Sequence, residues 1–236
     1  MNDTELAWQE FTEQISKLKV LKSIIEHSAE VQINHYKKMG SNYDTDIKRY
    51  HHGINFVKHK HINNKPFVVS IETKSFNINE YIVLLEEQHN EQYKLVLAKA
   101  YESFKKFIKD IFGNENEVNI LIKNNYKDVY HESFNVNLFY DINVIRIMRN
   151  KISHNETIND ENIIYNEIEK ILSKQNIYFQ DTDKEILLSF TKEFIDSSNG
   201  IILREKKLQN GGHWNRIGVL IDCLLSYSYH IKETKT

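Results

Sequence analysis

The sequence predicts a mainly α-helical protein, and three observations lead to that fold class. Apolar residues recur at helical spacing along most of the chain. The 236 residues include one proline and seven glycines, several of them where helices would end. Only the region around residues 53–73 has the β-branched and aromatic character of strands. We therefore expect an antiparallel helical bundle over residues 77–236, preceded by an N-terminal helix and a small β-hairpin extension in residues 1–76.

The first predicted helix covers roughly residues 4–39, from the capping pair Asn2–Asp3 to a stop at Gly40. The stretches GINFVKH and PFVVSIET then flank the turn-like INNK, which predicts one β-hairpin as the only sheet of the protein. Helical spacing returns after this hairpin. Asn79 can cap the next long helix, or two in series, and Gly113 can end it.

The rest of the chain predicts shorter helices. One is expected over residues 116–125, and the next runs from about 136 into the segment RNKISH. The stretch ENIIYNEIEKILSK is amphipathic, and a Thr182–Glu185 capping box opens the helix that follows it. The segment LQNGGHWN is expected to be a loop, with the last helix over about 214–232.

Composition limits the possible functions. A net charge of -2 and a pI near 6.6 give no global basic field, so nonspecific polyanion binding is not expected, although a local basic cleft is allowed. The single Cys223 excludes an intrachain disulfide and fits a reducing compartment, and its apolar surroundings predict a buried, inert thiol. The N-terminus lacks a secretory signal, and no apolar run could span a bilayer. We therefore expect a cytoplasmic protein without a membrane partner.

The histidine-rich stretch YHHGINFVKHKHI is the first of two places that could carry chemistry. On a strand, His59 and His61 point to the same face and could ligate a metal, with His51 and His52 nearby in sequence. The chain has no HExxH motif and no Cys/His framework to complete such a site. We favour a hairpin with solvated histidines, so the sequence predicts no metal site and no cofactor.

The second place is VIRIMRNKISHNET, residues 144–157, where Arg149, Asn150 and His154 follow an apolar stretch. Arg149 and His154 would point apart on a continuous helix, but they can converge if the helix ends near Ser153. Arginine forks onto phosphate, histidine moves protons near neutral pH, and asparagine can orient either partner. The segment therefore indicates phosphodiester chemistry. The alternative is that these are surface residues, with the cations favoured by the helix dipole.

The pattern Arg149-Asn150-x-x-x-His154 resembles the RNxxxH form of the signature of HEPN domains. These are helical-bundle proteins of prokaryotic conflict systems and of some eukaryotic RNA-processing factors. The resemblance covers about residues 77–232 and leaves 1–76 unexplained. First helices of this family often carry an acidic or polar residue facing the arginine, and Glu102 aligns with that position here.

The resemblance implies a metal-independent endoribonuclease of a toxin–antitoxin or antiviral defence system. The RNA 2′-hydroxyl would attack the adjacent phosphorus, leaving a cyclic phosphate and a 5′-hydroxyl. His154 would transfer the proton, Arg149 would stabilise charge on the phosphoryl oxygens, and Asn150 would position the phosphate or the imidazole. Family members typically dimerise so that two motifs share one cleft, which implies a homodimer, RNA as substrate, and an antitoxin or defence-system partner. One variant carries a modified tyrosine where this chain has Glu156, which argues against that form of regulation.

Two other interpretations stay open. The chain could be a non-catalytic HEPN-like module that binds RNA or a protein, or a helical adaptor that makes contacts through its hairpin. His213 and Trp214 could border a base-stacking site, but packing of the Trp on the bundle is favoured. Tyr227 and Tyr229 are expected in the core or in an interface.

Overall fold

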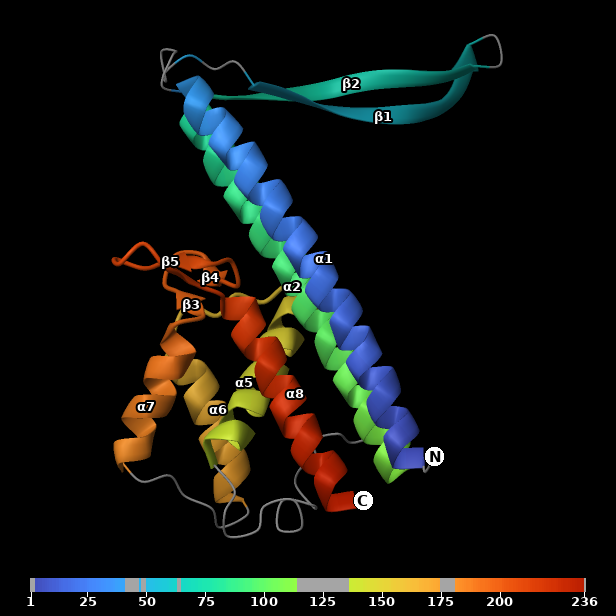
Figure 1. Ribbon diagram of the computed structural model, residues 1–236. Coiled ribbons are helices and arrows are strands. Elements are labelled where there is room, and N and C mark those ends of the chain that lie inside the picture. Colours follow the sequence, from blue (N-terminus) through green and yellow to red (C-terminus); the bar gives the residue numbers. More distant parts are fainter. Residues whose placement is uncertain are drawn as a thin grey trace. The chain divides into compact units, whose positions relative to one another are not determined.

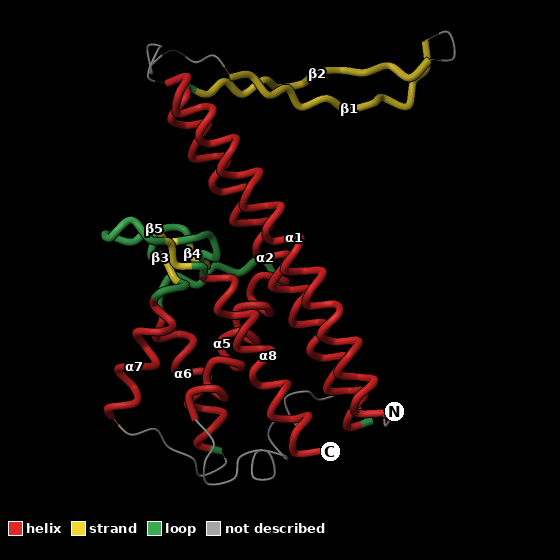
Figure 2. The backbone as a smooth tube through the Cα atoms, in the orientation of Figure 1, coloured by secondary structure: helices red, strands yellow, loops and turns green. Residues whose placement is uncertain are grey.

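The computed structural model describes residues 3–40, 47, 50–62, 65–113, 136–174 and 181–235. This part of the chain is mainly helical, which confirms the predicted fold class (Figures 1 and 2). Six helices lie in these ranges: α1 (Asp3–Gly40), α2 (Ile78–Phe112), α5 (Val136–Ser153), α6 (Glu161–Ser173), α7 (Asp181–Lys192) and α8 (Arg216–Lys235). The helix predicted over 116–125 lies outside the described residues. No helix in these ranges is both long enough and apolar enough to cross a bilayer.

The contacts divide the chain into two compact units. One combines Met1–Ser23 with Asn90–Thr236, and the other is Ile24–His89. Each of the two long helices, α1 and α2, contributes to both units. The sequence predicted a boundary between residues 76 and 77, whereas these units divide the chain within the two helices.

The smaller unit carries the predicted hairpin. Strand β1 (Tyr50–Ile62) pairs antiparallel with β2 (Lys65–Phe76), with register irregularities after Ile54 and after Lys58. The hairpin prediction is therefore confirmed, although the strands extend beyond residues 53–73. In the helical part of this unit, the ring of Tyr36 on α1 meets that of Tyr81 on α2 edge-on, with centroids 4.9 Å apart.

Helix α2 is capped at both ends by local chemistry. Asn77 Oδ1 accepts the N–H of Glu80, and Glu80 Oε2 accepts the N–H of Asn77, both at 2.9 Å. This reciprocal capping box makes Asn77 the cap, so the predicted cap at Asn79 was wrong. At the other end Gly113 adopts a φ of 73° and donates its N–H to Lys109 O, as expected for a glycine that ends a helix.

The larger unit is built around α5. Every residue from 142 to 148 is buried, so α5 is covered on all sides rather than along one stripe. Helices α6, α7 and α8 all contact it. The surrounding core includes Phe104 against Tyr227 and Phe11 against Phe107, at centroid distances of 5.8 and 5.0 Å. This burial fixes the position at which the end of α5 reaches the surface.

Two further two-stranded sheets lie between α7 and α8. Strands β3 (Ile195–Asp196) and β4 (Gly200–Ile201) form one, and β5 (Lys206–Lys207) and β6 (His213–Trp214) form the other. The prediction of a single sheet was therefore wrong, because strands of two residues carry no periodicity to read. Part of LQNGGHWN is strand β6 rather than loop. The predicted capping box required Thr182 to lie just ahead of helix α7. The helix begins at Asp181, so Thr182 lies within its first turn instead.

Candidate functional site

The motif lies where α5 ends, and the backbone there forms a Schellman cap. The N–H of Glu156 bonds to Lys151 O at 2.9 Å, and the N–H of Asn155 bonds to Ile152 O at 3.2 Å. Asn155 adopts the left-handed conformation with a φ of 53°, which asparagine tolerates better than most residues. The helix therefore ends where the polar run SHNET begins, and His154 occupies the C-cap position.

Arg149 is held by two side chains beside this end. Its Nη2 donates to Glu102 Oε1 on α2, and its Nη1 donates to Asn150 Oδ1 at 3.1 Å. The guanidinium carbon also lies 6.0 Å from the centroid of the Tyr101 ring, within range of a cation–π contact. The structure thus brings together three of the four residues that the sequence singled out: Arg149, Asn150 and Glu102.

The Arg149 guanidinium keeps hydrogen-bonding capacity after these contacts. A guanidinium has five N–H donors, and each Nη carries two, so one N–H on each Nη is left over. The side chain is 25% exposed, while that of Glu102 is 47% exposed, so a ligand can reach the pair. Its Nε is buried without a partner within the described part of the chain.

His154 is exposed one residue beyond the end of α5. Its backbone N–H still bonds to Asn150 O at 3.1 Å, so the helical geometry extends to it. Among the residues that the structure describes, no hydrogen bond or ion pair joins Arg149 to His154. The site therefore consists of a fixed guanidinium and a separate, solvent-accessible imidazole.

Arg146, one turn before Arg149, was not singled out by the sequence analysis. It is buried, its Nε donates to Asn143 Oδ1 at 3.2 Å, and its Nη2 lies 3.9 Å from Glu167 Oε1 without a hydrogen bond. Burial raises the pKa of Tyr101 well above its usual range, and the charges of Arg146 and Arg149 oppose that rise. The positive charges of both arginines thus favour the ionised form of the buried Tyr101 phenol. Their spacing of three residues was the sequence signal for this arrangement.

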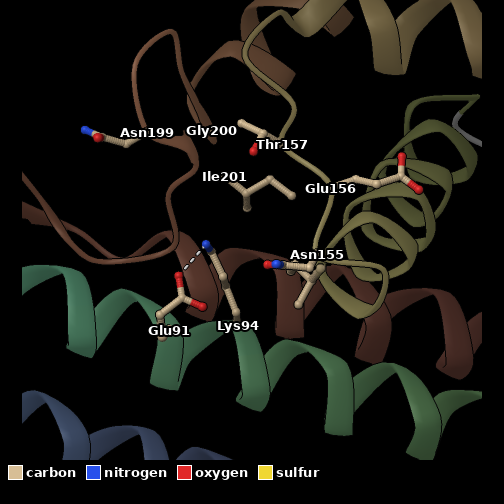
Figure 3. Close-up of a pocket in the computed structure, with 9 residues that line it drawn as sticks. Glu91, Lys94, Asn155, Glu156, Thr157, Asn199, Gly200 and Ile201 are labelled. Atoms are coloured by element: carbon tan, nitrogen blue, oxygen red, sulfur yellow. Dashed lines mark hydrogen bonds and ion pairs between the residues drawn. The ribbon is translucent and has the colours of Figure 1, made fainter. Parts of the chain in front are cut away.

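A polar pocket of about 160 Å³ borders the last turn of α5. Its walls come from three segments: Glu91 and Lys94 on α2; Ile152, Asn155, Glu156 and Thr157 around the end of α5; and Asn199, Gly200 and Ile201 at β4. Figure 3 shows Lys94 and Asn155 extending into this space, while the side chains of Glu156 and Asn199 point away from it. Sequence reasoning missed this pocket because its walls are far apart along the chain.

The β4 wall of the pocket is positioned by two residues. Asn90, buried on α2, accepts the N–H groups of Leu203 and Arg204 and donates to Ile201 O at 2.9 Å. Gly200 has a φ of 73°, and a Cβ added there would lie 3.0 Å from Thr157 Cγ2. Only glycine fits this close approach without strain. The chain therefore holds β4 tightly against the segment that follows His154.

The other candidates have structural partners. The ring of Trp214 packs on Phe194 at 5.4 Å, in line with the favoured interpretation, and His213 Nδ1 lies 3.2 Å from Glu205 Oε2. Tyr227 is buried, whereas Tyr229 is about half exposed and its ring meets that of Trp8 edge-on.

Cys223 is partly buried, and its Sγ lies 3.7 Å from Asp141 Oδ2. Burial, together with this carboxyl group, raises the pKa of the thiol to about 12, so the reactive thiolate is strongly disfavoured.

The structure describes the backbone of the hairpin but not the side chains of its histidines, which are His51, His52, His59 and His61. Within the described ranges, no group of three or more His, Cys, Asp or Glu side chains comes together to hold a metal ion. No family model, no curated protein and no solved structure matches this chain. The geometry at the end of α5 is therefore the feature from which a function can be inferred.

Proposed function

We propose that this protein is a metal-independent endoribonuclease of the HEPN type, acting in a toxin–antitoxin or antiviral defence system. The observation that carries the proposal is the end of α5. There a guanidinium fixed by Glu102 and Asn150 lies five residues before an exposed imidazole at the helix cap. RNA transesterification needs an anchored cation and a group that transfers protons, and we propose that the bound RNA reaches both.

The roles follow from the chemistry of each group. The RNA 2′-hydroxyl attacks the neighbouring phosphorus, and the bond from phosphorus to the 5′-oxygen breaks. His154 accepts or returns the proton in this step. Arg149 uses its two remaining Nη N–H groups to bind the phosphoryl oxygens as their charge grows, while Glu102 and Asn150 keep the guanidinium in place. These residues supply the charge stabilisation without requiring a metal.

One imidazole per motif is too little for a reaction that needs both a base and an acid. We therefore propose a homodimer in which two motifs face one RNA across a two-fold axis, each supplying one His154. Static light scattering at micromolar concentration tests this. A strict monomer that still cleaves RNA would rule out the composite site but not the nuclease.

The test of the function is incubation of the purified full chain with total RNA in EDTA. We expect cleavage to persist in the chelator, to leave cyclic phosphate ends, and to fail on DNA or 2′-deoxy-substituted RNA, because the nucleophile belongs to the substrate. His154→Ala should lower the rate roughly 10²–10⁴-fold, the usual effect of removing a general acid or base.

The matched control for this test is His27→Ala, which removes another exposed histidine, in the smaller unit, and should leave the rate unchanged. Cleavage that is lost in EDTA, or that survives His154→Ala, would contradict the proposal.

A second candidate function is a non-catalytic RNA- or protein-binding module. The observation that favours it is that Arg149 is engaged with Glu102 and Asn150, and that no hydrogen bond or ion pair joins it to His154 among the described residues. In that case the His154→Ala chain and the unmodified chain would both bind RNA with equal affinity, and neither would cut it.

A further inference from the structure

We propose that the pocket beside the end of α5 is a base-recognition subsite that holds one nucleobase of single-stranded RNA. This inference rests on the proposed ribonuclease function and adds a source of sequence preference to it. Asn155, which lines the pocket, directly follows His154 in the chain. A base in this pocket would therefore contact the residue next to His154, and its phosphate group would lie at the surface around the end of α5.

The size of the pocket fits one ring system. Pockets for drug-sized ligands enclose roughly 300–1,000 Å³, whereas this one encloses about 160 Å³. A whole nucleotide would not fit, but a single heterocycle splayed out of a strand would. Sequence-specific readers of RNA commonly take up unstacked bases in this way.

The groups around the pocket suit the edge of a base. The Lys94 ammonium has three donors and uses one on Glu91 Oε1 at 2.6 Å, so two remain. The Asn155 amide and the Thr157 hydroxyl can each donate and accept, and Ile152 and Ile201 add apolar surface for a flat ring.

The same groups disfavour an anion. The Glu91 carboxylate neutralises Lys94 and repels a phosphate group. A neutral molecule with both donors and acceptors along its edge is the better match, and a nucleobase is such a molecule.

The pocket is also preorganised. The Schellman cap fixes the backbone of Asn155, so only its side-chain torsions are left to order when a ligand binds. Asn90 and Gly200 hold the opposite wall in place. A ligand therefore meets walls that are already formed, and base discrimination does not have to offset the ordering of a loop.

The test measures binding of four fluorescent ten-nucleotide RNAs, one for each base, by anisotropy at fixed salt. The full chain carrying His154→Ala is used so that the RNA stays intact. We expect dissociation constants that differ by about fivefold or more between the best and the worst base, since hydrogen bonds to a base edge discriminate against the bases that cannot form them.

Adding Asn155→Gly removes the amide but keeps the left-handed cap, and Lys94→Met removes the ammonium. Each of these substitutions should make the dissociation constants of the four RNAs nearly equal. Asn166→Ala, at an exposed position on α6, is the matched control and should leave the base preference intact.

Two outcomes would overturn the proposal: equal affinity for all four RNAs, or a preference that survives both pocket substitutions. Mapping of cleavage sites with the unmodified chain separates this proposal from the function on which it rests. Cleavage that depends on His154 but shows no base preference contradicts the pocket and leaves the nuclease standing. A base preference that Asn155→Gly removes, in a chain that cuts no RNA, supports the pocket and contradicts the nuclease.

Discussion

The middle and the end of α5 place the same residue type in opposite settings. Arg146 lies among buried neighbours, and one of its terminal nitrogens is buried without a hydrogen bond to any residue that the structure describes. Arg149, a single turn later, is a quarter exposed, pairs with Glu102 and Asn150, and keeps free donors. The helix is continuous between them, so what changes is the distance from its end. A cation in the middle is enclosed by the fold, whereas a cation at the end is available to a ligand.

Within this comparison, the largest effect is expected when the same substitution is made at each of the two arginines. Arg149→Met should lower kcat/KM for RNA cleavage roughly 10²–10³-fold, as expected for loss of a donor to a developing oxyanion. Arg146→Met should change it less than about threefold, and it should leave stability unchanged or raised, because it removes a poorly paired buried charge. Steady-state kinetics and thermal unfolding check both variants. Equal loss of activity in both variants would show that Arg146 matters to the reaction as much as Arg149, although it is enclosed by the fold.

A smaller effect concerns Asp141 in the enclosed part of α5. Burial raises the pKa of this carboxyl to about 7, while the Cys223 thiol acts in the opposite direction. A carboxyl with a raised pKa adds stability below its unfolded pKa and loses that contribution as pH rises through about 7.

Asp141→Asn should therefore match the parent near pH 4 and be more stable by on the order of 4 kcal/mol at pH 8. Urea unfolding across this range measures the difference between the two proteins. A difference that does not vary with pH would show that Asp141 is ionised at no cost in the folded state.

The cap at the end of α5 gives a third test. Asparagine tolerates the left-handed conformation because its amide can form local hydrogen bonds, whereas alanine has no such group. Asn155→Ala should therefore lower the free energy of unfolding by about 1 kcal/mol. Asn155→Gly should be neutral or slightly stabilising, because glycine adopts this φ freely. Chemical denaturation of the pair provides the comparison. If alanine were as stable as glycine, the end of α5 would not depend on the Schellman geometry.

The smallest effect is expected at Glu102. Glu102→Gln removes the charge that faces Arg149 but keeps a hydrogen-bond acceptor. The pair is partly exposed, so stability should change by less than about 1 kcal/mol, whereas RNA cleavage should fall several-fold as the guanidinium becomes less well held. Activity measured over a range of salt concentrations checks this. A loss as large as that of Arg149→Met would give Glu102 a more direct role in the reaction.

Sequence patterns predicted much of the local structure. The spacing of apolar residues and the positions of glycine and turn residues predicted the helical class, the ends of α1 at Gly40 and of α2 at Gly113, and the hairpin. The end of α5 near Ser153 was also predictable, because SHNET is the kind of polar, asparagine-containing run that ends helices. These features depend on residues close together in the chain, and their energies are decided locally.

The sequence by itself determined the composition of the motif and the place where its helix ends. Only the tertiary structure decided that Arg149 meets Glu102, that Arg146 is enclosed, and that Asn90 ties β4 to α2. It also decided the pocket, whose walls come from three separate segments. Such contacts join residues tens of positions apart. They follow from how several apolar faces share one core, which no local pattern specifies.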